Sequence, residues 1–316
     1  MEKKMNDKLF DLVIVGSGPA GLSAAIYAAR AELNFIVIDK SPVSGGQVIN
    51  TYEVDNYPGI DGVSGMELSK SFRAHAEKLG AEFRTADIER IEQSSEECNG
   101  TKIFNIVIDN DEIIRTRTLI IATGVRNRKL EVKGEKEFSG KGVSYCATCD
   151  GAFFRNKTVA VAGGGDVAVE DAIFLARQCK KVYIVHRRDE FRAAKTLVSS
   201  LKTLENVEII FDSTIEEIYG EKLVKGIRIK NVKSGVEKEI EVNGVFIAVG
   251  TVPESGLVKD MVKLEDNGSI VAGEDTMTSM PGIFAAGDVR TKPLRQIVTA
   301  AADGANAVTA VEKYLM

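Results

Sequence analysis

Two cysteines separated by two residues offer the clearest chemistry in the sequence. Cys146 and Cys149 stand in the run Cys-Ala-Thr-Cys-Asp. This spacing lets two thiols close a small disulfide ring at the start of a helix, where the local field lowers the pKa of a thiol and provides a thiolate for exchange. Asp150 follows directly and could supply or accept the proton that thiol chemistry requires. Cys146, Cys149 and Asp150 are therefore candidate catalytic residues.

Half of a zinc site is the structural alternative for such a pair. Zinc needs four ligands, and the other candidates, Cys98, Cys179, His75 and His186, are scattered without a second close pair. We therefore expect no metal site. Cys98 is predicted to be an exposed loop thiol, Cys179 a packing residue and His75 a solvated residue of a helix.

A glycine-rich turn near the start of the sequence predicts a first dinucleotide site. Residues 9–15 (LFDLVIV) read as a strand, Gly16–Gly21 (GSGPAG) as the turn and residues 22–31 as a helix. The next strand, residues 35–38, ends at Asp39, which is placed to hydrogen-bond an adenosine ribose. Strand, turn, helix and acid follow one another as a dinucleotide-binding unit requires.

Three glycines of this turn have separate roles in such a unit. Gly16 permits the tight turn, Gly18 lets the backbone approach a pyrophosphate, and Gly21 allows the helix to pack closely on the strand. The N-terminus of the helix then faces the phosphate charge. We therefore expect a dinucleotide to bind at this turn.

The same pattern occurs a second time further along the chain. Residues 158–162 read as a strand, Gly163–Ala168 (GGGDVA) as a GxGxxA turn, residues 169–178 as a helix and residues 182–185 as the next strand. Two such units in one chain suggest one bound cofactor that exchanges a hydride with a second, diffusible one.

The residues after the last strand of the second unit indicate which coenzyme it binds. His186, Arg187 and Arg188 stand where a site for NADH has an acid, and Arg192 follows shortly after. An acid would select a free ribose 2′-hydroxyl, whereas clustered guanidinium groups bind a 2′-phosphate through charge-assisted contacts. The second nucleotide is therefore predicted to be NADPH.

Another apolar run lies near the end of the sequence. Residues 283–287 (IFAAG) end at Gly287, Asp288 follows, and Arg295 and Gln296 then lead into a helix of small residues. An aspartate at a strand end can bond a ribityl hydroxyl, and the following helix can direct its positive end at a flavin ring.

Similar strands on either side of the second unit indicate an insertion. Residues 120–124 (IIATG) and 246–250 (FIAVG) each end at a glycine and bracket this unit like the two crossings of a hinge. We expect an α/β fold with two Rossmann-like dinucleotide-binding domains, one inserted into the other. The predicted boundaries are 1–127 and 251–316 for the discontinuous domain and 128–250 for the insert.

Composition and charge narrow the class of protein. The 316 residues are 44% hydrophobic and 28% charged, which is typical of a globular protein of about two domains. The net charge of −5, with interspersed signs, gives no basic face for nucleic acid and no polybasic tail for anionic lipid. The apolar run at residues 12–15 is too short for a signal peptide or a membrane span. We expect a cytoplasmic protein with no nucleic-acid or membrane partner.

The sequence resembles the bacterial-type, low-molecular-weight thioredoxin reductases over nearly its whole length. The motifs that carry the resemblance are GSGPAG (16–21), GGQ (45–47), NYPG (56–59), ATG (122–124), CATCD (146–150), GGGDVA (163–168), HRRDEFRA (186–193), FAAGD (284–288) and RQI (295–297). The resemblance implies FAD in the domain formed by the two ends of the chain and NADPH in the insert. It also implies thioredoxin or a thioredoxin-like protein as the partner, and a homodimer.

The resemblance assigns site residues motif by motif. For FAD it implies Gly16, Ser17, Gly18, Pro19, Ala20, Gly21, Asp39, Lys40, Gly45, Gly46, Gln47, Asn56, Thr123, Gly124, Gly287, Asp288, Arg295, Gln296 and Ile297. For NADPH it implies Gly163, Gly165, Asp166, Val167, Ala168, His186, Arg187, Arg188 and Arg192. In the family the second cysteine faces the flavin and the first attacks the partner disulfide, which gives these roles to Cys149 and Cys146.

Two departures from the family pattern concern the coenzyme side. Val167 stands where the family usually has a serine, and residues 250–255 read GTVPES where the family usually has G-x-x-P-N-T. The first removes a hydroxyl near the NADPH phosphates and the second changes a loop beside the hinge. Both bear on coenzyme affinity and leave the reaction class unchanged.

Two other functions remain as alternatives. A related flavoprotein could use the same cysteines with ferredoxin as donor or oxygen as acceptor, although it would not need the intact cluster of Arg187, Arg188 and Arg192. A nucleotide-sensing redox switch would report the state of the cell to a partner, and it would be reduced once without turnover.

The order of the motifs along the chain predicts a domain rotation. Cys146, Cys149 and the NADPH motifs share the insert, whereas the flavin belongs to the flanking domain. Hydride transfer needs the nicotinamide within ~3 to 3.5 Å of the flavin, and disulfide reduction needs Cys149 comparably close. Because a compact flavin pocket does not admit both at once, we expect residues 128–250 to rotate between half-reactions.

Overall fold

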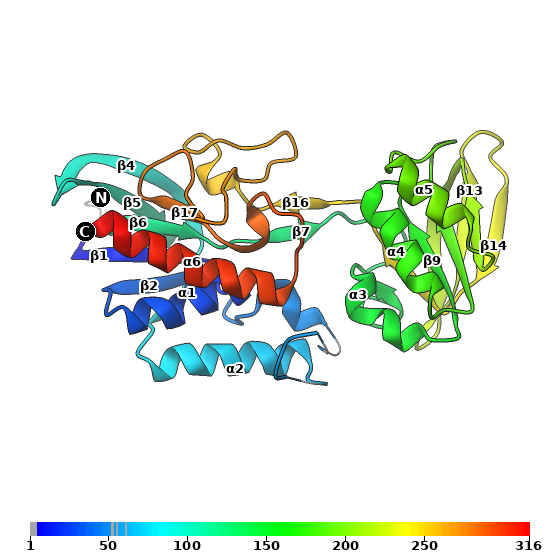
Figure 1. The fold of residues 1–316 in the computed structure, drawn as a ribbon, viewed down its shortest axis with the longest axis horizontal. Coiled ribbons are helices and arrows are strands. Elements are labelled where there is room, and N and C mark those ends of the chain that lie inside the picture. The colour runs from blue at the N-terminus through cyan, green and yellow to red at the C-terminus, as the bar shows by residue number, and fades with distance from the viewer. Residues whose placement is uncertain (1–4, 52–53, 55, 61) are drawn as a thin grey trace. The chain divides into compact units, whose positions relative to one another are not determined.

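The computed structural model describes residues 5–51, 54, 56–60 and 62–316. These residues divide into two compact units (Figure 1). Unit 1 takes the described residues of 1–50, 56–126 and 252–316, and unit 2 takes those of 51–55 and 127–251. Each unit is built on a largely parallel sheet with helices against it. The expected fold class, α/β with one parallel-sheet unit inserted into another, is confirmed.

The sheet of unit 1 has the strand order β3-β2-β1-β6-β5-β4, with β17 also paired to β6. Its strands are β1 (Met5–Val15), β2 (Phe35–Asp39), β3 (Phe83–Thr85), β4 (Ile88–Cys98), β5 (Thr101–Ile108), β6 (Glu112–Ile121) and β17 (Ile283–Ala285). β5 pairs antiparallel with both β4 and β6, and the other pairs are parallel. Other parts of the chain pack against both faces of this sheet. Its central strands are therefore buried on both sides and consist of continuous runs of Ile, Val and Leu.

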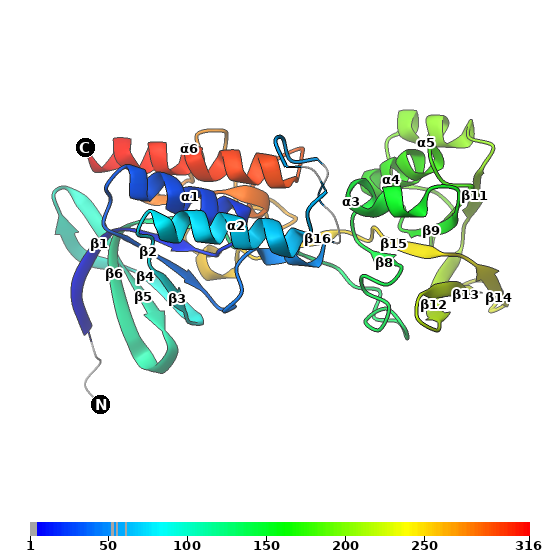
Figure 2. The same ribbon diagram turned by 90° about the horizontal axis from the view of Figure 1, so that it is seen from below.

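Three helices lie side by side over one face of this sheet (Figure 2). They are α1 (Pro19–Arg30), α2 (Gly65–Lys78) and α6 (Ile297–Leu315). Small residues allow α1 and α6 to approach closely, since a Cβ at Gly304 would lie 2.1 Å from the carbonyl oxygen of Ala20. Ser64 caps α2 and forms a capping box with Glu67.

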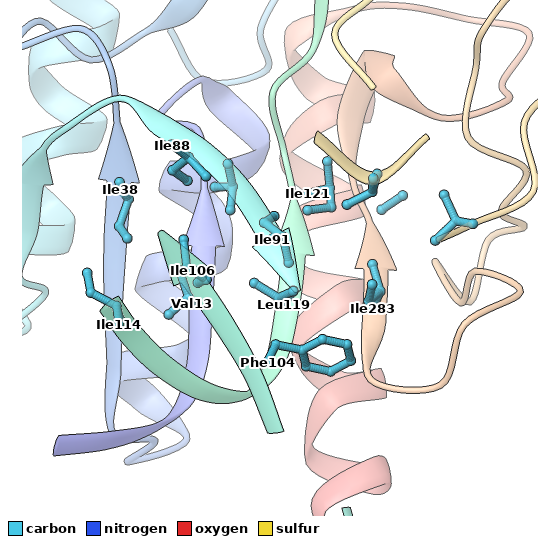
Figure 3. Packing of buried hydrophobic residues seen from close by; sticks show 14 of the residues in the cluster. Val13, Ile38, Ile88, Ile91, Phe104, Ile106, Ile114, Leu119, Ile121 and Ile283 are labelled. Carbon is cyan, nitrogen blue, oxygen red and sulfur yellow. The ribbon is translucent and has the colours of Figure 1, made fainter. Parts of the chain in front are cut away.

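The opposite face of the parallel strands is covered by the β4–β5 ribbon, which continues the same sheet, and by a segment that follows β16 (Thr251–Pro253). Side chains of β4 and β5 form one buried cluster with those of the parallel strands (Figure 3), which includes Val13, Ile38, Ile91, Phe104, Ile106, Leu119 and Ile283. Residues after β16, Val258 and Ile270 among them, complete the same cluster. This packing fixes the carboxyl ends of β1, β2 and β6, where the predicted site residues of unit 1 stand.

Unit 2 contains a parallel sheet of order β11-β10-β9-β15-β8 and a separate antiparallel sheet. The parallel strands are β8 (Val143–Ser144), β9 (Thr158–Ala162), β10 (Lys181–Val185), β11 (Val207–Ile210) and β15 (Gly244–Ile247). The antiparallel strands are β12 (Ser213–Gly220), β13 (Val224–Asn231) and β14 (Glu237–Glu241), and the helices are α3 (Ala147–Asp150), α4 (Asp166–Ala176) and α5 (Lys195–Lys202). The antiparallel sheet packs on one face of the parallel sheet and the helices pack on the other.

Two short strands carry the chain between the units. They are β7 (Val125–Asn127) and β16 (Thr251–Pro253), and they pair with each other. Each adjoins a glycine with a positive φ, Gly124 at 71° and Gly250 at 106°. The sequence predicted that two apolar strands mark the crossings. In the structure these two segments form the ends of β6 and β15, and they lead into Gly124 and Gly250.

Several local features differ from the sequence expectations. α1 begins at Pro19, earlier than expected, because proline suits the first turn of a helix, where its missing N–H has no role. Cys98 ends strand β4, half-buried and paired with Thr101, so its assignment to a loop was wrong. Cys179 is buried and His75 is exposed, as expected. Among the described residues, no helix has the length and apolarity to cross a membrane.

Candidate functional site

Cys146 and Cys149 form a disulfide bond in unit 2, with their Cα atoms 5.3 Å apart. Cys146 is the N-cap residue of α3, and its Sγ accepts a hydrogen bond from the backbone N–H of Cys149 at 3.2 Å. The hydroxyl oxygen of Thr148 lies 3.4 Å from the same sulfur. Both cysteines are half-buried. The disulfide is therefore partly accessible, as exchange with another thiol or disulfide requires.

A carboxyl group lies next to the disulfide in the sequence. Asp150 Oδ2 accepts a hydrogen bond from Ser144 Oγ at 2.6 Å, whereas Oδ1 is buried and has no hydrogen-bond partner in the described part of the chain. Burial raises the pKa of Asp150, and the hydrogen bond from Ser144 opposes this effect. A carboxyl group with a raised pKa keeps its proton to higher pH, where it can pass it to a thiolate.

Sequence reasoning missed a buried carboxylate that fixes the loop before the disulfide. Glu135 accepts hydrogen bonds from the Tyr145 hydroxyl at 2.7 Å and from the backbone N–H groups of Leu130 and Glu131 at 3.1 and 2.6 Å. Tyr145 directly precedes Cys146, so these bonds tie the loop to the redox pair. No motif or spacing marks a single glutamate in a loop, and only the fold reveals it.

The first glycine-rich turn has the form of a phosphate cradle. Gly16 has φ 103°, and a Cβ there would lie 2.5 Å from the carbonyl oxygen of Ala122. At Gly21 a Cβ would lie 1.9 Å from the carbonyl oxygen of Gly16, so the helix packs directly on the turn. A Cβ at Gly18 would meet no atom within 4 Å. Because α1 has no side-chain cap at Gly18, its first N–H groups can bind an anion.

Asp39 and the segment after β2 close around this turn. Asp39 Oδ2 accepts hydrogen bonds from the backbone N–H of Ser17 at 2.6 Å and from its hydroxyl at 2.7 Å. The N–H of Gly45 donates to the carbonyl oxygen of Ser17 at 2.8 Å, and the side-chain amide of Gln47 donates to the carbonyl oxygen of Val125. Predicted residues from separate segments therefore meet at the N-terminus of α1.

A cavity of about 560 Å³ opens at the carboxyl ends of β1 and β2. This volume suits a nucleotide, and the position is the switch point of the sheet, where the chain continues to opposite sides of β1. The predicted residues in its lining are Gly16, Asp39, Lys40 and Thr123. The other walls come from residues 86–91, which no motif marks, and from residues between 254 and 261, of which the sequence indicated only the loop at 250–255.

A second group of predicted residues gathers between β17 and the start of α6. Asp288 Oδ1 and Arg295 Nε are buried and have no hydrogen-bond partner among the residues that the structure describes. Burial raises the pKa of Asp288. Gln296 caps α6, whose first residue is Ile297, and the Asn56 amide donates to Gln296 Oε1 at 3.0 Å. Orphaned polar atoms of this kind are satisfied when a polar ligand binds.

A buried ion-pair cluster that sequence reasoning also missed supports this turn. Asp303 of α6 accepts hydrogen bonds from Arg290 at 2.7 and 2.8 Å, from Lys292 at 2.9 Å and from the backbone N–H of Gly287 at 2.8 Å. Burial alone would raise the pKa of Asp303, but the bonds from the two cations outweigh burial and lower it. The cluster therefore ties α6 to the turn that carries Asp288.

The second glycine-rich turn, in unit 2, repeats the geometry of the first. At Gly163, where φ is 152°, a Cβ would lie 2.4 Å from the carbonyl oxygen of Ala248. Gly165 is the N-cap of α4, and a Cβ there would meet no atom within 4 Å. Val167 is exposed and Ala168 is buried against the strand. The turn therefore opens at Gly165 and at Val167, where the expected hydroxyl is absent.

Three exposed arginines follow β10, on a segment that is held against this turn. Arg187, Arg188 and Arg192 have no carboxylate partner in the described part of the chain. The backbone N–H of Arg192 donates to the carbonyl oxygen of Gly164 at 2.8 Å, and Asp166 accepts an N–H from the same segment at 2.7 Å. The arrangement leaves guanidinium groups available to an anionic ligand beside the turn.

His186 has a different environment from the three arginines. It is buried, its ring stacks on Phe191 with 5.7 Å between centroids, and a Cβ at Gly164 would lie 2.2 Å from its Nδ1. Burial, reinforced by the charges of the nearby arginines, lowers its pKa. A neutral ring therefore supports the turn from beneath, while the exposed arginines lie at the surface.

Comparisons with known proteins agree with this arrangement. The family model for pyridine nucleotide-disulphide oxidoreductases matches residues 10–304. A Listeria monocytogenes protein named thioredoxin reductase is 45% identical over 310 residues, which cover 98% of this chain and 95% of that protein. A Bacillus subtilis thioredoxin reductase is 41% identical over 310 residues, with 98% and 96% covered. The crystal structure of a Streptococcus pyogenes thioredoxin reductase has a TM-score of 0.89 at 43% identity and covers 98% of this chain and 99% of its own. The chain therefore belongs to the pyridine nucleotide-disulphide oxidoreductase family and, within it, to the bacterial-type thioredoxin reductases.

Proposed function

We propose that the protein reduces the disulfide of thioredoxin or a thioredoxin-like protein with electrons from NADPH. The observation that carries the proposal is the half-accessible Cys146–Cys149 disulfide, adjacent to Asp150 and in the same unit as the arginine-lined turn. Family membership supports the reaction class, and the names of the relatives support the partner.

Unit 1 is the proposed FAD domain. The open position at Gly18 fits a pyrophosphate, and the orphaned atoms Asp288 Oδ1 and Arg295 Nε fit the polar groups of a flavin nucleotide. Gly16–Gly21, Asp39, Lys40 and Thr123 would hold the nucleotide part. FAD bound there would accept a hydride from NADPH and pass two electrons to the disulfide.

Unit 2 is the proposed NADPH domain. The N-terminus of α4 at Gly165 would hold the pyrophosphate, and Arg187, Arg188 and Arg192 would bind the 2′-phosphate. This cluster distinguishes the proposal from a reductase that takes its electrons from ferredoxin, because such a protein has no need to recognise a 2′-phosphate.

The residues of the active site carry out thiol exchange. Once two electrons have broken the Cys146–Cys149 bond, the thiolate of Cys146 attacks one sulfur of the partner disulfide, and the other partner sulfur leaves as a thiolate. Cys149 then attacks Cys146, which re-forms the internal disulfide and releases the partner with both of its thiols. Asp150 gives a proton to a leaving thiolate and recovers one from a thiol.

Location and assembly are proposed on the same basis. Work in the cytoplasm is consistent with two further cysteines, Cys98 and Cys179, that remain thiols, since reducing compartments keep thiols unpaired. A homodimer follows from the family resemblance alone, and light scattering of the purified protein will test it.

Steady-state turnover tests the proposed function. The FAD-loaded protein should oxidise NADPH continuously when oxidised thioredoxin is supplied, and Cys146→Ser and Cys149→Ser should each abolish this turnover. Cys98→Ser is the matched control, because it removes another half-buried cysteine outside the pair, and it should leave the rate unchanged. Oxidation that stops after one equivalent of NADPH would instead identify a redox switch.

A further inference from the structure

Ser144 connects the central sheet of unit 2 to the acid beside the disulfide. It ends β8 and pairs with Phe246 of β15, so the sheet fixes its backbone. Its side chain is buried, with 5% of its surface exposed. The sheet therefore fixes the backbone that carries this hydroxyl.

The Ser144 hydroxyl makes contacts on both sides of the redox pair. Its oxygen accepts the backbone N–H of Cys146 at 3.0 Å. Its hydrogen can go to Asp150 Oδ2 at 2.6 Å or to the carbonyl oxygen of Cys146 at 3.3 Å. The shorter contact goes to the group that becomes charged, and hydrogen bonds to charged groups are the stronger ones. The single hydroxyl hydrogen is therefore directed to Asp150 when the carboxyl group is ionised.

This contact distinguishes the two oxygens of the carboxyl group. Oδ2 is held by Ser144, whereas Oδ1 is buried and has no hydrogen-bond partner in the described part of the chain. Because Ser144 donates its hydrogen to Oδ2, Oδ1 is the oxygen of Asp150 that is left to carry a proton. Without the serine, the carboxyl group could turn about its bond to Cβ, and either oxygen could take that place.

We propose that Ser144 is a positioning residue that holds Asp150 Oδ2, so that Oδ1 delivers the proton when the Cys146–Cys149 disulfide is reduced. This inference rests on the proposed function. Two electrons break the S–S bond, the proton on Oδ1 passes to one sulfur, and the products are one thiol, one thiolate and the Asp150 carboxylate. The Ser144 O–H then stabilises that carboxylate through Oδ2. In the reverse direction the carboxylate recovers the proton from the thiol.

The surroundings of Asp150 leave Ser144 as the polar group that adjusts its acidity. Burial is the larger influence on the pKa of Asp150 and raises it, and the Ser144 hydrogen bond lowers it. Glu170 and Asp171 on α4, the helix that packs against α3, interact with each other, and burial followed by the charge of Glu170 raises the pKa of Asp171 to about 7. Glu170 and Asp171 do not contribute to the pKa shift of Asp150. Glu135, which accepts a hydrogen bond from the Tyr145 hydroxyl, does not contribute to it either.

The test is a set of variants of the FAD-loaded full-length protein. Ser144→Ala should move the titration midpoint of Asp150 to higher pH, as followed by NMR of carbon-13-labelled aspartate in the oxidised protein, with Asp150→Asn to assign the signal. The alkaline limb of the kcat profile should move in the same direction. At neutral pH kcat should fall at least about tenfold, because the proton donor is no longer held in place. Ser144→Thr keeps the hydroxyl and should restore the midpoint.

Two comparisons separate positioning from a general structural role. Ser213→Ala removes another buried hydroxyl of unit 2, which donates to the carbonyl oxygen of Phe211, and it should leave the Asp150 midpoint unchanged. In the Asp150→Asn background, Ser144→Ala should cause no further loss of kcat.

Three outcomes would overturn the inference. The first is an unchanged Asp150 midpoint in Ser144→Ala, and the second is an equal loss of kcat with and without Asp150. The third applies if Ser144→Ala does not fold, because Ser144→Thr then decides alone. In that case an Asp150 midpoint in Ser144→Thr that differs from the wild-type value would overturn the inference. Normal turnover by Asp150→Asn would instead contradict the role of Asp150 in the proposed function, which is a separate failure.

Discussion

At the scale of single residues, the buried carboxyl group of Asp150 makes stability depend on pH. Burial raises its pKa in the folded state above the unfolded value of about 3.9, so the folded protein binds this proton more tightly. The stability that the proton contributes is present at low pH and is lost as the pH rises through the folded-state pKa.

Asp150→Asn should remove this loss of stability and also slow turnover. The urea midpoint of the variant should fall less than that of the wild type as the pH is raised from about 4 to neutrality. Turnover with thioredoxin should slow at least about tenfold, because an amide cannot donate the proton. The same pH dependence of unfolding in both proteins would contradict a raised pKa for this group.

The arginines of unit 2 carry the prediction about coenzyme choice. Arg187→Gln combined with Arg188→Gln should raise the KM for NADPH and abolish a preference over NADH of at least tenfold, since each charge-assisted contact contributes ~1.5 to 3 kcal/mol. Arg177→Gln is the matched control, because Arg177 is another exposed arginine of unit 2 at the end of α4. Equal kcat/KM for the two coenzymes in the unmodified protein would contradict the assignment.

The sequence reveals the residues whose type and spacing repeat a known chemical pattern. The cysteine pair and the glycines of both turns are of this kind, because a strand, a glycine turn and a helix in this order predict a tight turn, a close helix contact and an open position for a phosphate. Glu135 and Asp303 are not, since each acts through groups that only the tertiary structure brings near: a tyrosine hydroxyl for the first and two cations for the second.

At the scale of elements, the ion pairs of Asp303 attach α6 to the turn that carries Asp288. Asp303→Asn leaves Arg290 and Lys292 buried with one formal charge fewer to balance them, and breaking such a buried pair costs ~3 to 5 kcal/mol. The variant should unfold at lower urea concentration and should release FAD more readily, as measured by flavin fluorescence.

The control for Asp303→Asn is Glu312→Gln on the same helix, which forms no ion pair among the described residues and should change little. Because the pKa of Asp303 is lowered in the folded state, its stabilising effect is present above the unfolded value of about 3.9 and is lost as the pH falls through the folded value. A variant as stable as the wild type at neutral pH would show that the cluster does not hold α6 in place.

The central parallel strands could be predicted, whereas the short parallel strands β3, β8 and β11 and the antiparallel strands could not. β1 and β9 are buried on both faces and therefore appear as continuous apolar runs. β4 and β14 each have one polar face, and in β14 only Ile240 is buried between charged neighbours. Register shifts in the pairing of β4 with β5 interrupt the alternation further. Such segments read as polar loops until their partner strands are known.

At the scale of the whole molecule, the two paired crossings are where a rotation of unit 2 would occur. Gly250 has φ 106°, and the nearest atom to a Cβ there would be Arg128 Cδ at 3.8 Å. Gly250→Ala should therefore cost ~1 to 2 kcal/mol through backbone strain alone, without a steric collision. If the chain turns at this residue, turnover should slow because the alanine restricts the conformations of the crossing.

Gly235→Ala is the control for the crossing, since Gly235 has φ 73° and a Cβ there would meet no atom within 4 Å, in the hairpin between β13 and β14. Both substitutions should lower stability by a similar amount, but only Gly250→Ala should slow the reoxidation of the reduced flavin by thioredoxin in stopped-flow experiments. Equal rates in the two variants would show that the predicted rotation of unit 2 does not depend on Gly250.

The central claim is that electrons from NADPH reach the partner through the Cys146–Cys149 disulfide, and alkylation followed by mass spectrometry tests it most directly. Without NADPH, the anaerobic FAD-loaded protein should be alkylated at Cys98 and protected at Cys146 and Cys149. NADPH should make both cysteines reactive, and oxidised thioredoxin should then restore their protection while its own thiols appear in equal number. Cys98 should react throughout and so controls for reagent access. If thioredoxin became reduced while Cys146 and Cys149 stayed protected at every time point, the electrons would take another path and the account would be wrong.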